Sequence, residues 1–257
     1  MVVGIKKFKA YFQDFTDNYV IIGGTACDII IEEAGFTPRA TKDIDIIIIV
    51  EALTSDFIKK FWEFIADANY KHQEKSPDDR KYYRFRNPKN KNFPIQIELF
   101  SKEPELLNLN EGSHLTPIPI DEDLSSLSAI LMNDDYYDYT LAHSFIEDGV
   151  NIANNEALIC LKAKAFLDMT IRKQKGEHID ERNIRKHKTD IFRLAVFLTE
   201  HDKFVLPHSI HSDLMKVTDI FRDNLPDKNI FKSMGMGAIN TKIVLEKLIS
   251  SFNLKNK

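Results

Sequence analysis

The chain has 257 residues, of which 43% are hydrophobic and 29% charged, and its formal net charge is -4. This composition is typical of a folded globular protein with one large or two modest domains, and it excludes the disordered and fibrous classes. No apolar run has membrane-spanning length, no signal-type block opens the chain, and two distant cysteines exclude a disulfide scaffold, so we expect a cytoplasmic protein without membrane contact.

The first half of the sequence alternates between helix and strand patterns. Apolar spacing predicts helices over residues 4–15, 25–34 and 55–69. Strands are predicted over residues 19–22, 42–50, 82–86 and 93–100, and near 116–120 and 136–141. This half therefore has the elements of a sheet with flanking helices.

The second half is helical throughout. Helices are predicted over residues 156–172, 190–199, 209–222 and 241–252. The change of pattern predicts a domain of residues 1–154 followed by a helical domain of residues 155–257. We expect an α+β fold, in which a mixed sheet flanked by helices precedes a helical C-terminal domain.

Three acidic residues are the first candidates for chemistry. Asp43 and Asp45 lie two apart on one predicted strand, so their side chains share a face, and Glu98 lies in another strand of alternating polarity. If the strands are adjacent, the carboxylates converge, and two of them about 5 Å apart repel by roughly 3 kcal/mol at a dielectric near 20. Such a group raises a pKa or holds a cation, with oxygen ligands favouring Mg²⁺ or Mn²⁺. Alternating acids on a solvated strand are the alternative.

A glycine turn is the second candidate feature. Gly23, Gly24 and Thr25 lie between a predicted strand and a predicted helix, where glycines and free N–H groups let a phosphate approach the backbone. A tight turn without a ligand explains the same residues. The segment is neither a Walker loop nor a dinucleotide-binding fingerprint.

Two segments together resemble a known signature. Gly23-Gly24-Thr25-Ala26, followed by Arg39-Ala40-Thr41-Lys42-Asp43-Ile44-Asp45, is similar to the DNA polymerase β-like nucleotidyltransferase superfamily. More narrowly, it resembles the AbiEii-type nucleotidyltransferases, the toxins of type IV toxin–antitoxin systems. Thr41 stands where that group usually has serine, which keeps the hydroxyl.

The resemblance continues in the helical half, to about residue 194. Lys162 matches the lysine of a family helix, and Asp190 matches the first acid of a later motif whose second acid is replaced by Arg193. Read from the residues alone, Lys162 is also consistent with a solvated helix lysine, and Asp190 with a helix N-cap.

The resemblance implies a nucleotidyltransferase that uses Mg²⁺ or Mn²⁺ to move an NMP from an NTP to an acceptor hydroxyl on RNA or protein, with an antitoxin as partner. The implied catalytic residues are Asp43, Asp45, Glu98 and Asp190, of which the first three would bind the metal. The implied nucleotide-binding residues are Gly23, Gly24, Thr25, Arg39, Thr41 and Lys162. By helical geometry Lys162 should face the cleft and Lys164 should face away.

Two other functions stay open. One is transfer to a small molecule such as an aminoglycoside, which an acidic acceptor cleft would favour, whereas a basic groove favours RNA. The other is a nucleotide-binding module without catalysis. The basic stretch over residues 172–188 could follow a nucleic-acid backbone, and residues 82–86 could stack a base, but a solvated helix connection and a half-buried strand explain them as well.

Overall fold

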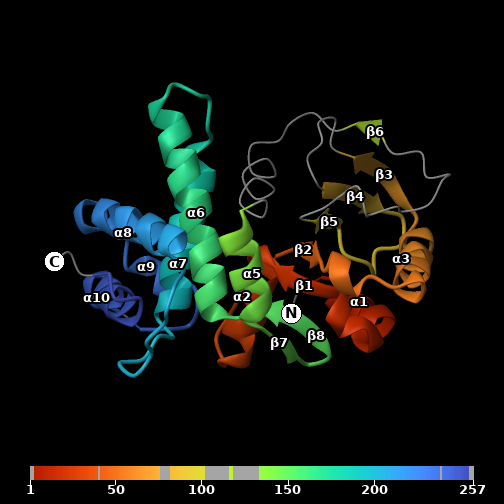
Figure 1. Ribbon diagram of the computed structural model, residues 1–257, viewed down its shortest axis with the longest axis horizontal. Helices are drawn as coiled ribbons and strands as arrows, with labels where there is room; N and C mark the ends of the chain where they lie inside the picture. The colour runs from red at the N-terminus through yellow and green to blue at the C-terminus, as the bar shows by residue number, and fades with distance from the viewer. Residues whose placement is uncertain are drawn as a thin grey trace.

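The computed structural model describes residues 3–39, 41–75, 82–101, 116–117, 133–237 and 239–254. Its described strands form one mixed sheet in the order β6-β3-β4-β5-β2-β1-β8-β7 (Figure 1). The strands are β1 (Tyr19–Ile22), β2 (Asp43–Ile48), β3 (Tyr70–Lys75), β4 (Tyr82–Pro88), β5 (Gln96–Phe100), β6 (Thr116–Pro117), β7 (Ser144–Glu147) and β8 (Val150–Ala153).

Some helices alternate with the strands along the chain, and the others come after the last strand. Those within the first part are α1 (Ile5–Phe12), α2 (Gly23–Glu33), α3 (Ser55–Ala68) and α5 (Asp134–Ala142), with the 3-10 segments η1 (Gln13–Asn18) and η2 (Val50–Ala52). Those that follow are α6 (Asn155–Gln174), α7 (Glu181–Ala195), α8 (His208–Asp223), α9 (Asn229–Lys232) and α10 (Thr241–Ser251). This arrangement confirms the expected α+β class. The boundary between residues 154 and 155 stays a prediction. In the described part, no helix combines the length and apolar character that crossing a bilayer requires.

One face of the sheet packs against α1 and α3 through aromatic side chains. The ring of Phe8 lies 5.3 Å from that of Tyr19, and the ring of Phe61 lies 5.6 Å from that of Phe85, both edge to face. Offset and edge-on aromatic pairs of this kind add to the free energy gained by burying their area. Because side chains alternate along a strand, this apolar face directs Asp43 and Asp45 to the opposite side.

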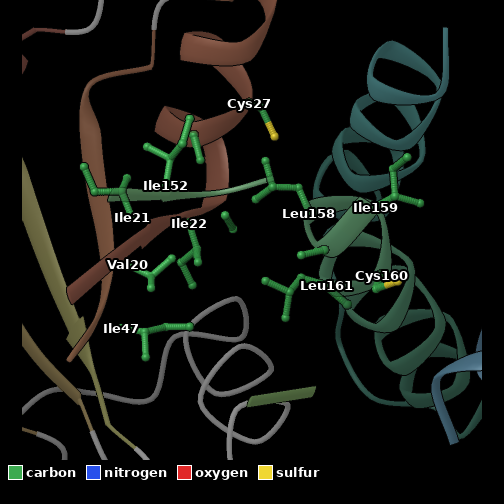
Figure 2. Close-up of a cluster of buried hydrophobic side chains, with 14 of the residues drawn as sticks. Val20, Ile21, Ile22, Cys27, Ile47, Ile152, Leu158, Ile159, Cys160 and Leu161 are labelled. Carbon is green, nitrogen blue, oxygen red and sulfur yellow. The ribbon is translucent and has the colours of Figure 1, made fainter. Parts of the chain in front are cut away.

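Helix α6 covers part of that opposite face. Figure 2 shows Leu158 and Leu161 projecting from α6 toward strand side chains such as Val20, Ile22 and Ile47. Ile159 and Cys160 point the other way from the same helix, and both are buried. A helix with apolar contacts on both sides lies inside the protein, so α6 connects the sheet to the later helices.

The strand register places the acidic residues side by side. Strands β2 and β5 pair in parallel, which sets Asp45 opposite Glu98 and Asp43 opposite Gln96. Strand β1 pairs with β2 in antiparallel orientation, with Ile22 opposite Asp45, so α2 begins directly beside that carboxylate. The polar positions of β2 and β5 therefore meet where α2 starts.

One strand prediction and one helix prediction differ clearly from the structure. Residues 136–141 form part of α5 and not a strand, because Asn133 caps the helix by accepting the Asp135 N–H at 3.0 Å and acidic residues fill the first turn. Helix α7 begins at Glu181, nine residues before the predicted start at 190, and its N-cap is Asp180. The N-cap interpretation of Asp190 is therefore wrong.

The remaining differences are smaller. The predicted helix over 4–15 ends at Phe12 and continues as η1, and the predicted strand over 93–100 begins only at Gln96. Of the predicted strand over 116–120, the first two residues form β6 and the rest lie outside the described residues. Strands β3, β7 and β8 and the short helix α9 were not predicted.

Candidate active site

A cavity of about 260 Å³ lies where the sheet meets α6 and α7. The predicted site residues that line it are Gly23, Gly24, Arg39, Thr41, Asp43, Asp45, Glu98 and Lys162. Thr25 and Asp190 are buried behind its wall. The wall also includes residues that were not among the predicted site residues: Arg84, Gln96, Leu158, Leu161, Ala165, Lys186 and His187. Residues that are far apart in the chain thus share one cavity. Gly23 and Lys162, for example, are separated by 139 positions.

Glu98 lies beside the two aspartates but is held by its own partners. Its Oε1 accepts hydrogen bonds from Arg84 Nε at 2.9 Å and from Gln96 Nε2 at 2.7 Å. The Arg84 and Glu98 residues are only 5% and 7% exposed, so this is a buried ion pair. Such a pair fixes the carboxylate in one orientation at the edge of the cavity.

Burial raises the pKa of all three acids, and repulsion by neighbouring carboxylates adds to the shift of Asp45 and Glu98. Desolvation is the largest cause for Asp43 and Asp45, and it is opposed by nearby cations. The pKa of Glu98 is raised well above its usual range, first by burial and then by the charge of Asp45, while Arg84 opposes the shift. All three carboxyl groups therefore take up a proton at higher pH than exposed carboxyl groups do.

The donor set fits a divalent cation held mainly by the two aspartates. Among the described residues, no group of three or more acidic, histidine or cysteine side chains is arranged to hold a metal ion by itself. Within the same residues, the Asp43 carboxylate has no hydrogen-bond or ion-pair partner. Mg²⁺ usually binds one or two carboxylates together with water and substrate phosphates, so Asp43 and Asp45 match that pattern. The metal role of Glu98 stays a prediction.

The glycine turn is shaped by the side chains packed against it. Gly23 has a φ of +70°, and a Cβ at this position would collide with the Asp45 carboxylate. A Cβ on Gly24 would lie 2.9 Å from Thr41 Oγ1 and 3.3 Å from Arg39 Nη2. Both positions therefore require glycine, and the start of α2 lies directly against these polar groups.

Two threonines near the turn have different environments. Thr25 Oγ1 donates a hydrogen bond to the Asp43 carbonyl oxygen at 2.5 Å, which ties α2 to β2 behind the cavity. Thr41 Oγ1 is buried and has no hydrogen-bond partner among the described residues. A buried hydroxyl without a partner at a cavity wall is a suitable contact for a ligand oxygen.

Asp190 joins two cations of the site. Its Oδ1 accepts from Arg39 Nη1 at 3.2 Å, and its Oδ2 lies 3.2 Å from Lys162 Nζ. Burial, the largest cause, would lower the pKa of Lys162, but the charge of Asp190 together with Cys27 and Asp45 outweighs it, and the pKa is raised. Burial alone would raise the pKa of Asp190, but the nearby cations, Lys162 and Arg39 first among them, outweigh burial and lower it. The cluster is therefore ionised, with a fixed geometry.

The orientation of the two lysines on α6 follows the predicted helical spacing. Lys162 lines the cavity and is 6% exposed. Lys164 points away from it and pairs with Asp213 at 2.9 Å and Asp168 at 3.3 Å. Lys162 is thus buried and paired, and the interpretation as a solvated lysine does not hold.

Some residues of the cavity are difficult to identify from the sequence alone. Arg84 becomes identifiable only from the β4–β5 register, which sets it opposite Glu98. His187 is partly buried, and burial followed by the charge of Lys162 lowers its pKa to about 3, so the imidazole is neutral. Lys186 is exposed at the cavity rim and belongs to the basic stretch over residues 172–188.

Other basic residues of that stretch form local ion pairs. Arg172 pairs with Glu177 at 2.7 Å, and Arg182 pairs with Asp180 at 2.7 Å. Lys173 also pairs with Glu181. These ion pairs join residues at the end of α6, in the connection and at the start of α7. Because the basic side chains are paired locally, they favour the interpretation of this part of the chain as a solvated connection.

Comparisons with known proteins give a limited result. No protein-family model and no curated protein matches the chain. Among solved structures, the chain is similar to the crystal structure of an antigenic nucleotidyltransferase-like protein from Paracoccidioides brasiliensis, with a TM-score of 0.43 and 13% sequence identity. The alignment covers 91% of this chain and 96% of that chain.

Proposed function

We propose that the protein is a nucleotidyltransferase that moves an NMP from an NTP to an acceptor hydroxyl with the help of Mg²⁺ or Mn²⁺. The observation that supports this most directly is one cavity that combines an aspartate pair, a glycine turn at a helix start and a cluster in which Arg39 and the buried Lys162 pair with the buried Asp190. Phosphoryl transfer depends mainly on positioning and on compensation of negative charge, and the cavity offers groups for both.

The triphosphate is assigned to the side of the cavity formed by α2, α6 and the segment before β2. There Thr41 Oγ1 lacks a partner and can donate to a phosphate oxygen. Lys162 and Arg39 supply positive charge where the departing pyrophosphate becomes more negative. Asp190 holds both cations in place before the nucleotide arrives, which reduces the reorganisation needed during the reaction.

The metal is assigned to Asp43 and Asp45. When bound, a divalent cation would polarise the transferred phosphate and favour ionisation of the acceptor hydroxyl. The raised pKa of both aspartates means that cation binding competes with protons, so affinity should increase as the pH rises. Because Gly23 has no side chain, it leaves room for the Asp45 carboxylate.

The charges around Asp43 favour an anionic acceptor. Lys186, Arg84 and Lys42 all lie close enough to lower the Asp43 pKa. A polycationic aminoglycoside would be repelled by these residues, whereas an RNA backbone would be attracted. We therefore place RNA before a small-molecule acceptor. Because the chain resembles AbiEii-type toxins, the proposal includes two further points: transfer inhibits growth, and an antitoxin relieves the inhibition.

The test is to incubate the purified protein with each α-labelled NTP, Mg²⁺ or Mn²⁺, and in turn bacterial RNA, bacterial protein or an aminoglycoside. We expect label in RNA, and none with the Asp43→Asn/Asp45→Asn variant. Label in the aminoglycoside would overturn the acceptor assignment. Nucleotide binding without transfer to any acceptor would support the catalytically silent module instead. Expression in bacteria should slow growth only with the aspartates intact.

A further inference from the structure

A fourth aspartate lies behind the nucleotide side of the cavity, and no motif includes it. Asp28 lies one helical turn after Gly24 on α2, so the two residues share a helix face. Asp28 is 2% exposed. Its Oδ1 accepts the Arg39 backbone N–H at 3.2 Å, and its Oδ2 accepts the Thr41 backbone N–H at 2.6 Å. One carboxylate thus holds two amides of the same short segment.

That segment brings its side chains to the wall of the cavity. The Thr41 hydroxyl and the Arg39 guanidinium both approach Gly24, as the contacts of a Cβ placed there demonstrate. Arg39 also reaches Asp190 on α7. The distance between the start of α2 and these two groups is therefore set by the Asp28 contacts one turn further along the same helix.

An aspartate is better suited than an asparagine to accept hydrogen bonds from two backbone N–H groups. A carboxylate has an acceptor oxygen for each of the two N–H groups, whereas an asparagine would accept from one and direct its own NH₂ group at the other. A hydrogen bond to a charged acceptor is also stronger than one to a neutral acceptor. Buried carboxylates without a cation partner are costly, so these two contacts are the main compensation for Asp28.

We propose that Asp28 is a positioning residue, which holds the Arg39–Thr41 segment against Gly24 so that Thr41 Oγ1 and Arg39 meet the triphosphate. This inference rests on the proposed function. Asp28 itself touches neither nucleotide nor metal and acts only through the segment that it fastens.

The first test measures the segment without substrate. In the Asp28→Asn variant, amide hydrogen exchange at Arg39 and Thr41 should accelerate about tenfold or more, since one of the two hydrogen bonds is lost. Asp213→Asn is the matched control, because Asp213 is a buried aspartate, 9% exposed, that binds Tyr136 and Lys164 away from the cavity. Unchanged exchange at these two amides in Asp28→Asn would overturn the inference.

The second test measures transfer. Asp28→Asn should raise the KM for the NTP about tenfold, because the Thr41 contact is made in the ground state and the transition state alike. It should change kcat less than about threefold, because Asp190 still holds the Arg39 guanidinium. Asp213→Asn should leave KM unchanged. Combining Asp28→Asn with Thr41→Ala should raise KM no further than the larger single effect, since both remove the same contact. Additive effects, or an equal KM change in Asp213→Asn, would show a merely structural role.

The two proposals fail in different ways. If the wild-type protein neither binds nor transfers a nucleotide, the proposed function fails and the positioning role fails with it, whatever the exchange data show. If the wild-type protein is active and Asp28→Asn keeps its KM, only the positioning role is overturned.

Discussion

Lys162 is the residue whose position the sequence explains least. It lies more than a hundred positions after Asp45, yet its ammonium group is buried against Asp190 and at the same cavity. Composition gives no reason for this meeting, and only the family resemblance suggested it. Removal of this buried and paired lysine must affect folding as well as transfer.

We expect Lys162→Met to lower transfer by at least about a hundredfold, because the charge acts on the developing pyrophosphate. It should also lower the free energy of unfolding by about 2 kcal/mol, since Asp190 keeps only Arg39 as a partner. Lys164→Met is the control, because it removes a cation from the same helix but outside the cavity. Steady-state kinetics and urea unfolding measure both effects. Normal transfer in a folded Lys162→Met protein would mean that another cation compensates the phosphate charge.

Gly23 offers a second test at the scale of one residue. Gly23→Ala should lower the free energy of unfolding by about 1–2 kcal/mol through its positive φ, and should also displace the Asp45 carboxylate. Gly35→Ala has the same backbone strain, with a φ of +81°, but no atom within 4 Å of the new Cβ. Both variants should melt earlier, while only Gly23→Ala should lose stabilisation by Mn²⁺. Equal Mn²⁺ responses in the two variants would contradict the metal assignment.

At the scale of elements, strands β2, β5 and β4 carry one polar row across the sheet. Asp45, Glu98 and Arg84 occupy neighbouring positions in that row. The alternation of polar and apolar residues predicted the facing of the first two, because it depends only on strand periodicity. The third needed the order of the strands, which depends on long-range pairing and cannot be derived from one strand at a time.

The buried pair in this row should have a large effect on stability when it is broken from one side. Arg84→Met leaves Glu98 buried without its cation and should lower the free energy of unfolding by about 3–5 kcal/mol. Adding Glu98→Gln should recover part of that loss, because the remaining group is neutral. Urea unfolding of both variants makes the comparison. A double variant less stable than Arg84→Met would mean that the pair is not what stabilises this part of the sheet.

Two errors in element prediction have clear physical causes. The β7–β8 hairpin was missed although Asp148 and Gly149 both have positive φ, the feature that an Asp-Gly turn signals. In α7, charged residues over 181–188 hid the helical period that becomes clear only after Asp190. By contrast, β1, β2, α2 and α3 followed directly from β-branched runs, glycine positions and apolar spacing.

At the scale of the whole molecule, stability should depend on pH through His187. Its pKa is about 3 in the folded protein and near 6.5 when unfolded, so below pH 6.5 the unfolded chain binds the extra proton. This contribution to stability is present above pH 6.5 and decreases as the pH falls toward 3, by at most about 1.4 kcal/mol per pH unit. The raised pKa of Asp43, Asp45 and Glu98 acts in the opposite direction.

The His187→Gln variant separates these effects. Between pH 7.5 and 5.5, its free energy of unfolding should decrease less than that of the wild-type protein, because the carboxylates are common to both. Urea unfolding at several pH values measures the difference between the two curves. Parallel curves would mean that His187 is accessible to protons in the folded protein.

The contact between Arg39 and Asp190 spans 151 positions of the chain. During synthesis the aspartate pair and the glycine turn are made well before Asp190, the acid that pairs with both Lys162 and Arg39. A growing chain, or a fragment that ends before α7, therefore has the first wall of the cavity without the second. Under the proposed function, transfer can therefore begin only after α7 has been made, which leaves time for a partner to reach the nascent chain first.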